Sequence, residues 1–289
     1  MNQSIPVSEA ADPARSDRGS SSMSNFVSRL LVAAVGLPLV LGLIWLGGWW
    51  LFALVAVAAF VGVHEFVTVA RPLRPLAPAV YGGVLLALLG AHLGGIEWLL
   101  AGFLATFLFG FLLHALSSTR APTTAALGST VLGAAWIGLG LGFVLLLREM
   151  HTEGRLVALT VVLTVFAADT VAYLTGRFVG RHRLAPRLSP KKTWEGLVGG
   201  AVAGVFVSFI ALYDTRHDYL SVWQAVVLGL VVVAAAILGD LFESALKRDL
   251  EVKDTGSLLG GHGGMLDRID ALLFAAPAAY FLVLGFGFT

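Results

Sequence analysis

The sequence contains no cysteine and few charged residues. Of its 289 residues, 13% are Asp, Glu, Lys or Arg, against about 25% in a typical soluble protein. The absence of cysteine excludes a disulfide scaffold, a thiolate zinc site and a cysteine nucleophile. A formal net charge of +1 argues against a nucleic-acid-binding protein, which needs a basic face. The composition therefore predicts no nucleic-acid partner.

Apolar residues are in excess, at 57% of the chain, with a mean hydropathy of +0.86. After a polar segment at 1–25, predicted to be a disordered tail, apolar stretches long enough for a membrane helix of ~20 residues recur nine times. The nine predicted spans are Phe26–Leu46, Trp49–Ala70, Ala79–Gly94, Ile96–Leu116, Thr123–Leu147, Leu156–Gly180, Leu197–Tyr213, Val222–Leu246 and Ile269–Phe288. This pattern predicts an all-α, polytopic integral membrane protein in which residues 26–289 form a single helical domain.

Basic residues fall mostly on one side of these predicted spans. Sixteen of the nineteen Lys and Arg residues lie on the N-terminal side, and only Arg148, Arg155 and Arg216 lie opposite. Because Lys and Arg are enriched in cytoplasmic loops, this bias predicts a cytoplasmic N-terminus in the cell (inner or plasma) membrane. Ten of the sixteen lie in two segments, 177–192 and 247–268, which this topology places together on the cytoplasmic face.

The segment Gly239–Asp270 holds seven of the eighteen carboxylates. Helical spacing puts Asp240 and Lys247 on one face at the end of the eighth span, and Asp267 and Asp270 on one face at the start of the ninth. Mg²⁺ is bound through one or two carboxylates plus substrate phosphates, and basic residues neutralise phosphates. A cytoplasmic-face site for a metal and a nucleotide is therefore predicted in this segment.

Some of these features also have a purely structural interpretation. Asp267 could be an N-cap, with Asp270 in the first helical turn, and Lys247-Arg248 could be ordinary flanking charge. Asp240 is harder to explain in this way, because it lies inside an apolar span, where a carboxylate costs roughly 2.5–3.5 kcal/mol. The glycines at 260–264 are predicted to let backbone N–H groups approach a phosphate.

A second polar segment lies upstream, at Arg181–Gly196. Ser189, Lys192 and Thr193 offer hydroxyl and ammonium donors just before a helix whose N-terminus would point at an anion. The alternative is a loop whose arginines bind lipid headgroups. An acidic residue inside a membrane span usually has a functional role, so Asp169, within the sixth span, is predicted to be a functional residue. His64 and Glu65 lie near the end of the second span. Their polar groups are interpreted as stabilised by packing or by the membrane interface, without a functional role.

The stretch from Ser244 to Asp270 resembles the signature of the phosphatidate cytidylyltransferase (CDP-diacylglycerol synthase) family. Its matching positions are Ser244, Lys247, Arg248, Lys253, Asp254, His262, Gly263, Gly264, Asp267, Arg268 and Asp270. Segments 169–173 and 189–196 are also similar, so the resemblance covers roughly the C-terminal half, with the site mainly in 165–271. Two positions depart from the family pattern: Gly260 stands where Pro is usual, and Ala271 where Ser is common.

The resemblance implies transfer of a cytidylyl group from CTP to phosphatidate, giving CDP-diacylglycerol and pyrophosphate, with Mg²⁺ and room for a second cation. By the same resemblance the catalytic residues are Asp240, Asp267, Asp270, Lys247, Arg248, Lys253 and Asp254, of which the three aspartates Asp240, Asp267 and Asp270 hold metal. The implied substrate-binding residues are Ser189, Lys192, Thr193, Ser244, His262, Gly263, Gly264 and Arg268. A homodimer is left open.

Two other functions remain as alternatives. A CTP-dependent polyprenol or phytol kinase would transfer a terminal phosphoryl group to an alcohol, and an alcohol acceptor needs a base. An ion-coupled transporter would use Asp169 and Asp240 as an ion pathway, since acids inside a membrane mark such routes. The concentration of polar residues on one face disfavours the transporter, which would also need a polar opposite face.

Overall fold

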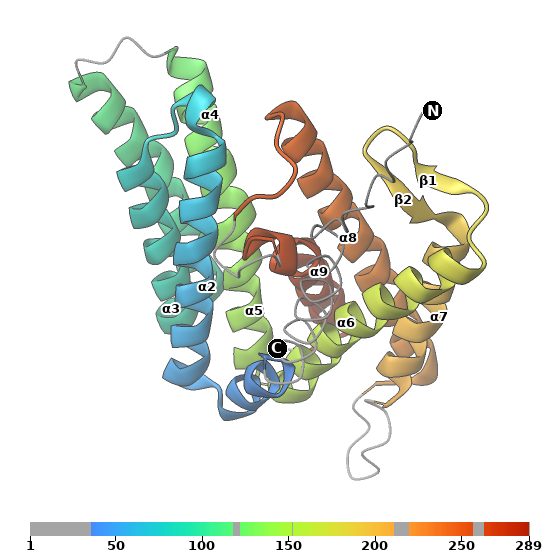
Figure 1. Ribbon diagram of the computed structural model, residues 1–289. Helices are drawn as coiled ribbons and strands as arrows, with labels where there is room; N and C mark the ends of the chain where they lie inside the picture. The colour runs from blue at the N-terminus through green and yellow to red at the C-terminus, as the bar shows by residue number, and fades with distance from the viewer. Residues whose placement is uncertain (1–35, 118–121, 152, 211–219, 257–262, 289) are drawn as a thin grey trace, which may run out of the picture. The chain divides into compact units, whose positions relative to one another are not determined.

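The computed structural model describes residues 36–117, 122–151, 153–210, 220–256 and 263–288 (Figure 1). The predicted tail at 1–25 and the first half of the first predicted span lie outside these residues. The helices considered below are α2 (Gly48–Val69), α3 (Ala77–Leu116), α4 (Thr123–Gly133), α5 (Gly140–Glu149), α6 (Gly154–Phe178), α7 (Trp194–Ile210), α8 (Val222–Asp249) and α9 (Leu266–Gly285). A short π-helix, Ala134–Leu139, joins α4 to α5.

Six helical segments of the described residues are long and apolar enough to cross a membrane. The prediction of a multi-pass helical membrane protein is confirmed at this level. Three differences separate the nine predicted spans from these six segments. The third and fourth predicted spans both lie in α3, whose 40 residues count as one segment although two helical parts meet at the non-helical residue Gly95, between the two predicted spans. The seventh corresponds to α7, which has only 17 residues, and the first is described only as the short helix Gly36–Leu46.

Helix α3 bends sharply at Gly95, whose φ of 75° lies in a region that favours glycine. The two parts of α3 then pack closely on each other at two further glycines. A Cβ at Gly90 would collide with the carbonyl of Trp98, and one at Gly102 would collide with the backbone at Ala87. Small residues allow such close helix contact within a membrane, so glycine makes this tight pairing possible.

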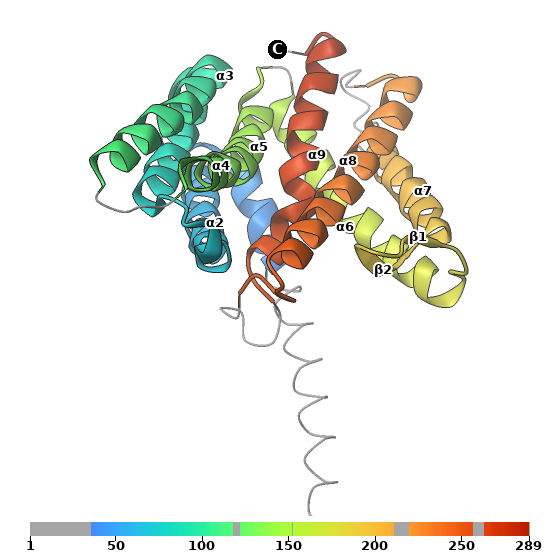
Figure 2. The ribbon, with the colours of Figure 1, turned by 90° about the horizontal axis from the view of Figure 1, so that it is seen from above.

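Close backbone contact at glycine also pairs α6 with α7 and α8 with α9. A Cβ at Gly196, near the start of α7, would lie 2.7 Å from the carbonyl oxygen of Ala172 on α6. A Cβ at Gly239 on α8 would lie 2.5 Å from the carbonyl oxygen of Asp270 on α9. This close contact brings Asp240, the residue after Gly239, next to the first turns of α9. Figures 1 and 2 show α8 and α9 between α2–α5 on one side and α6–α7 on the other.

One element departs from the predicted all-α fold. Strands β1 (Arg183–Ala185) and β2 (Ser189–Thr193) form an antiparallel hairpin between α6 and α7, where the sequence had indicated a loop. Glu195 anchors this hairpin to α7, because its carboxylate accepts hydrogen bonds from the backbone N–H groups of Arg181 at 3.1 Å and His182 at 3.2 Å. The His182 ring lies 2.6 Å from the same carboxylate. This side-chain contact is the main reason that the pKa of Glu195 falls to about 2.

Candidate functional site

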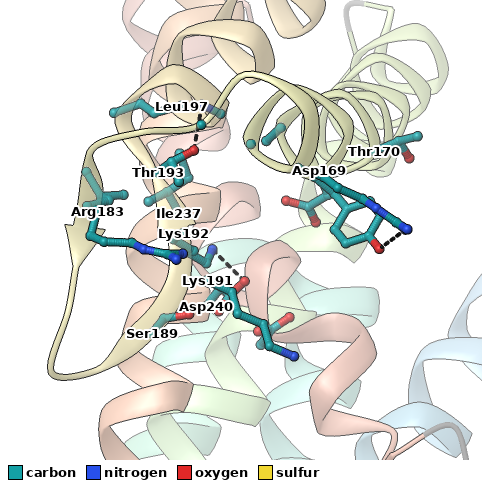
Figure 3. Close-up of a pocket in the computed structure, with 18 of the residues that line it drawn as sticks. Asp169, Thr170, Arg183, Ser189, Lys191, Lys192, Thr193, Leu197, Ile237 and Asp240 are labelled. Atoms are coloured by element: carbon teal, nitrogen blue, oxygen red, sulfur yellow. Dashed lines mark hydrogen bonds and ion pairs between the residues drawn. The ribbon is translucent and has the colours of Figure 1, made fainter.

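A cavity of about 850 Å³ lies among α6, the hairpin, α7, α8 and α9 (Figure 3). Its lining is unusually polar for a protein with so few charges. The charged residues that line it are Asp169, Arg177, Arg183, Lys191, Lys192, Asp240, Asp267, Arg268 and Asp270, and Thr170, Tyr173, Ser189 and Thr193 add hydroxyl groups. Four carboxylates from three helices therefore share one cavity with five basic side chains.

An ion pair joins the hairpin to α8 across this cavity. The Nζ of Lys192 lies 2.5 Å from Oδ2 of Asp240 (Figure 3). Ser244, one turn further along α8, donates its hydroxyl to Oδ1 of Asp240 at 3.4 Å. Asp169 faces the same space from α6. The ion pair and the partial exposure of Asp240 to the cavity together explain how a carboxylate is tolerated inside an apolar helix.

A second set of ion pairs joins α8 to α9. The Nζ of Lys247 lies 2.7 Å from Oε2 of Glu243 and 2.6 Å from Oδ1 of Asp267. Glu243 is buried, with 2% of its surface exposed, and its Oε1 has no hydrogen-bond partner among the described residues. Lys247 does not itself line the cavity. Its ammonium instead holds the Asp267 carboxylate in place at the cavity edge.

The other oxygen of Asp267 binds the polar segment between α8 and α9. Its Oδ2 accepts hydrogen bonds from the backbone N–H of Gly264 at 2.7 Å and from both the N–H and the hydroxyl of Thr255, at 3.3 and 3.1 Å. The predicted use of the Gly264 N–H for phosphate therefore differs from the structure, where Asp267 takes it. Gly263 has a φ of 77°, and His262 lies outside the described residues.

The three predicted metal ligands, Asp240, Asp267 and Asp270, all line the cavity. Asp270 is the most buried, with 8% of its surface exposed, and its Oδ1 accepts the N–H of Ala271 at 2.8 Å. Within the described ranges, no three metal-ligating side chains lie close enough to hold an ion by themselves. The oxygen donors still fit Mg²⁺, which binds through one or two carboxylates and completes its shell with water and phosphate oxygens.

Four other predicted residues are placed differently. Arg248, Lys253 and Asp254 are exposed at and beyond the end of α8, and none of them lines the cavity. Thr193 lines it but is buried, and its Oγ1 accepts the N–H of Gly196 at 3.1 Å. Its hydroxyl therefore serves as a cap for the first turn of α7, instead of being held free for a substrate.

Sequence reasoning missed two contributors to this region. Arg177 donates a hydrogen bond to the Tyr173 hydroxyl at 3.1 Å, and both side chains line the cavity from α6. Glu65, which the sequence had indicated to be a packing or interface residue, accepts hydrogen bonds at the start of α9. The signal that could have found Glu65 is the one applied to Asp169, an acidic side chain inside an apolar span.

Comparisons with known proteins identify the family to which the sequence is similar. The model of the cytidylyltransferase family matches residues 27–286. A phosphatidate cytidylyltransferase of Synechocystis is 32% identical over 288 residues, which cover 88% of this chain and 95% of that protein. One of Mycobacterium bovis is 34% identical over 266 residues, covering 86% and 85%. These matches confirm the resemblance drawn from the C-terminal half and extend it over nearly the whole chain.

Proposed function

This chain belongs to the cytidylyltransferase family, and from this premise we propose that it transfers a cytidylyl group from CTP to phosphatidate. A phosphate oxygen of phosphatidate attacks the α-phosphorus of CTP, and the bond between the α- and β-phosphates breaks. CDP-diacylglycerol and pyrophosphate are the products. The observation that carries the proposal is the cavity in which basic side chains and carboxylates from α6, the hairpin, α8 and α9 converge.

The chemistry requires two polyanions to meet. Because the phosphate of the acceptor is already ionised near neutral pH, no strong general base is needed, and the protein has to position the reactants and neutralise their charge. Lys192, Arg183 and Arg268 line the cavity and supply positive charge. Lys192 pairs with Asp240, and we propose that it turns to the phosphates when CTP arrives.

We propose that Asp240, Asp267 and Asp270 hold Mg²⁺ together with the phosphates of CTP. A bound Mg²⁺ would neutralise negative charge on those phosphates. The distribution of the ligands supports an ion that arrives with the nucleotide, since the three carboxylates line one cavity but do not form a closed protein site. Lys247 keeps Asp267 oriented through its 2.6 Å contact.

We further propose that the chain crosses the membrane nine times with its N-terminus in the cytoplasm, so that the cavity opens on the cytoplasmic face. CTP is a cytoplasmic nucleotide, and the lipid acceptor lies in the bilayer, so a site at that face meets both. The test uses the absence of native cysteine. A cysteine at Arg187 should react with a membrane-impermeant thiol reagent in inside-out vesicles and not in intact cells; the opposite pattern would reverse the topology.

The activity itself is tested by the fate of two labels. Purified protein in detergent receives phosphatidate, Mg²⁺ and CTP labelled either in the cytidine or in the γ-phosphate. We expect cytidine label in the lipid and γ-label only in pyrophosphate. A γ-label in lipid without cytidine would identify a lipid kinase, and ion flux in liposomes without nucleotide turnover would identify a transporter; either result would overturn the proposal.

A further inference from the structure

Glu65 lies on α2, far from the polar segments in sequence, yet its carboxylate lies at the start of α9. Its side chain is buried, with 2% exposed. Oε1 accepts the backbone N–H of Met265 and Oε2 that of Leu266, both at 2.9 Å. The first N–H groups of a helix have no partner within the helix and carry its positive dipole end. Glu65 therefore acts as a negatively charged cap supplied by another helix.

The surrounding backbone is shaped to admit this carboxylate. Two glycines of the segment that joins α8 to α9, Gly256 and Gly264, lie against it. A Cβ at Gly256 would collide with Oε1 of Glu65, and one at Gly264 would collide with Oε2 and with the Thr255 hydroxyl. Glycine at these two positions is thus explained by the contact with Glu65, without any close approach to a phosphate.

Glu65 is linked to Asp267 through Thr255. The Thr255 hydroxyl lies 3.4 Å from Oε2 of Glu65 and 3.1 Å from Oδ2 of Asp267, so it can donate to either carboxylate. Thr255 itself is buried. The two carboxylates therefore accept three consecutive backbone N–H groups, those of Gly264, Met265 and Leu266, and together they fix how the first turn of α9 is rotated.

Glu65 does not line the cavity, so it cannot touch the substrates there. We propose that Glu65 is a positioning residue, which fixes the first turn of α9 so that Asp267 and Asp270 face the cavity. The inference rests on the proposed function, because that function gives these two aspartates their role. It also follows that the N-terminus of α9 is not a phosphate site, since Glu65 already takes the N–H groups of Met265 and Leu266.

The test is Glu65→Gln, which keeps the size of the side chain but removes its charge and one acceptor oxygen. Hydrogen bonds to a charged group are stronger than those to a neutral one, so we expect amide exchange at Met265 and Leu266 to rise by roughly tenfold or more. The Mg²⁺ concentration for half-maximal activity should rise at least about fivefold and kcat should fall about tenfold, with KM for phosphatidate within about twofold. Glu97→Gln is the matched control, because Glu97 is exposed on α3.

These measurements distinguish a positioning role of Glu65 from an effect on the stability of the protein alone. Loss of folded protein would lower the maximal rate but leave the half-saturating Mg²⁺ concentration of the remaining enzyme unchanged. Unchanged amide exchange, or an unchanged Mg²⁺ requirement together with an unchanged kcat, would overturn the proposal. The exchange measurement needs no turnover, so it still tests the contact if the wild type fails to label lipid with cytidine, a result that would contradict the function alone.

Two milder variants keep the proposal testable if Glu65→Gln does not accumulate. Glu65→Asp keeps the charge on a shorter side chain, and we expect an intermediate Mg²⁺ requirement. Thr255→Val removes the shared hydroxyl at nearly constant volume, and we expect the Mg²⁺ requirement to rise by about twofold to fivefold. Wild-type constants in both variants would overturn the link between Glu65 and Asp267.

Discussion

Charged side chains have different partners in α2–α5 and in α6–α9. In α6–α9 and the hairpin, carboxylates and ammonium groups from separate elements pair around a cavity, as Lys192 and Asp240 do. In α2–α5, Arg148 donates to the backbone carbonyls of Ile44 and Trp45, and Glu149 lies 2.5 Å from the His92 ring. These groups also find partners on other elements, but none of them lines the cavity.

This difference separates a scaffold from a reactive region. Helices α2–α5 pack through glycines and apolar side chains, and Glu65 on α2 contributes a charged group to the other region. A substitution in the scaffold should therefore change stability and leave the kinetic constants alone, while one at the cavity should do the reverse. Glu65 is the exception, because it belongs to the first region and acts on the second.

The largest effect is expected from Asp240→Asn. Asp240 pairs with Lys192 and accepts the Ser244 hydroxyl, and the amide would keep the size of the side chain while losing its charge. We expect kcat to fall by about a hundredfold or more, with normal insertion into the membrane. Steady-state turnover in detergent measures this, and Asp249→Asn, an exposed carboxylate at the end of the same helix, is the control. Equal losses in the two variants would show that position at the cavity does not matter.

A smaller effect is expected from Lys192→Met. The variant removes the ammonium group that pairs with Asp240, so we expect kcat/KM for CTP to fall by about tenfold to fiftyfold. Lys191→Met provides the comparison within the same cavity: Lys191 also lines it, but is exposed and forms no ion pair with another described residue, so its loss should cost less than about threefold. The reverse ranking would assign the phosphate contact to Lys191.

Gly102→Ala should act on stability alone. The added Cβ would collide with the backbone at Ala87 in the other part of α3, at an expected cost of about 1–3 kcal/mol. A thermal melt in detergent should show a lower Tm, while KM and kcat per folded molecule stay within about twofold. Gly128→Ala is the control, because nothing lies within 4 Å of its added Cβ. Altered kinetic constants in Gly102→Ala would contradict the division into scaffold and reactive region.

The smallest effect is expected from Glu195→Gln, which loosens the hairpin. The contacts of Glu195 lower its pKa from 4.5 to about 2, so the carboxylate stabilises the hairpin fully above its ordinary pKa and loses this effect as the pH falls through about 2. At neutral pH we therefore expect faster tryptic cleavage after Arg187 and a fall in kcat of about twofold to fivefold. Cleavage at the wild-type rate would show that Glu195 does not anchor the hairpin.

Local spacing in the sequence was enough to predict the main acidic residues of the site. Asp267 and Asp270 share a helical face, and the eighth and ninth spans are consecutive, so their polar ends were expected together, and the structure places Asp240, Asp267 and Asp270 at one cavity. Arg248, Lys253 and Asp254 lie close to these residues in sequence but not at the cavity. Helix α8 ends at Asp249, and the chain then turns, which no helical spacing describes.

The remaining differences come from contacts between residues distant in sequence and from weak local patterns. The partners of Glu65 are 200 and 201 residues away, and a single acid in an apolar span does not reveal them. The hairpin has strands of three and five residues with no apolar alternation, so no pattern indicated it. The break between the third and fourth predicted spans, by contrast, coincides with Gly95, where α3 is interrupted by a non-helical residue.

Turnover of Asp267→Asn tests the central claim most directly. The measurement is cytidylyl transfer from CTP to phosphatidate per folded molecule, at saturating Mg²⁺, beside the amount of protein inserted in the membrane. Asp267 lines the cavity and is held by Lys247, Thr255 and Gly264. We expect normal insertion with a loss of activity of about a hundredfold or more. Activity within about tenfold of the wild type would contradict a metal-binding role for Asp267.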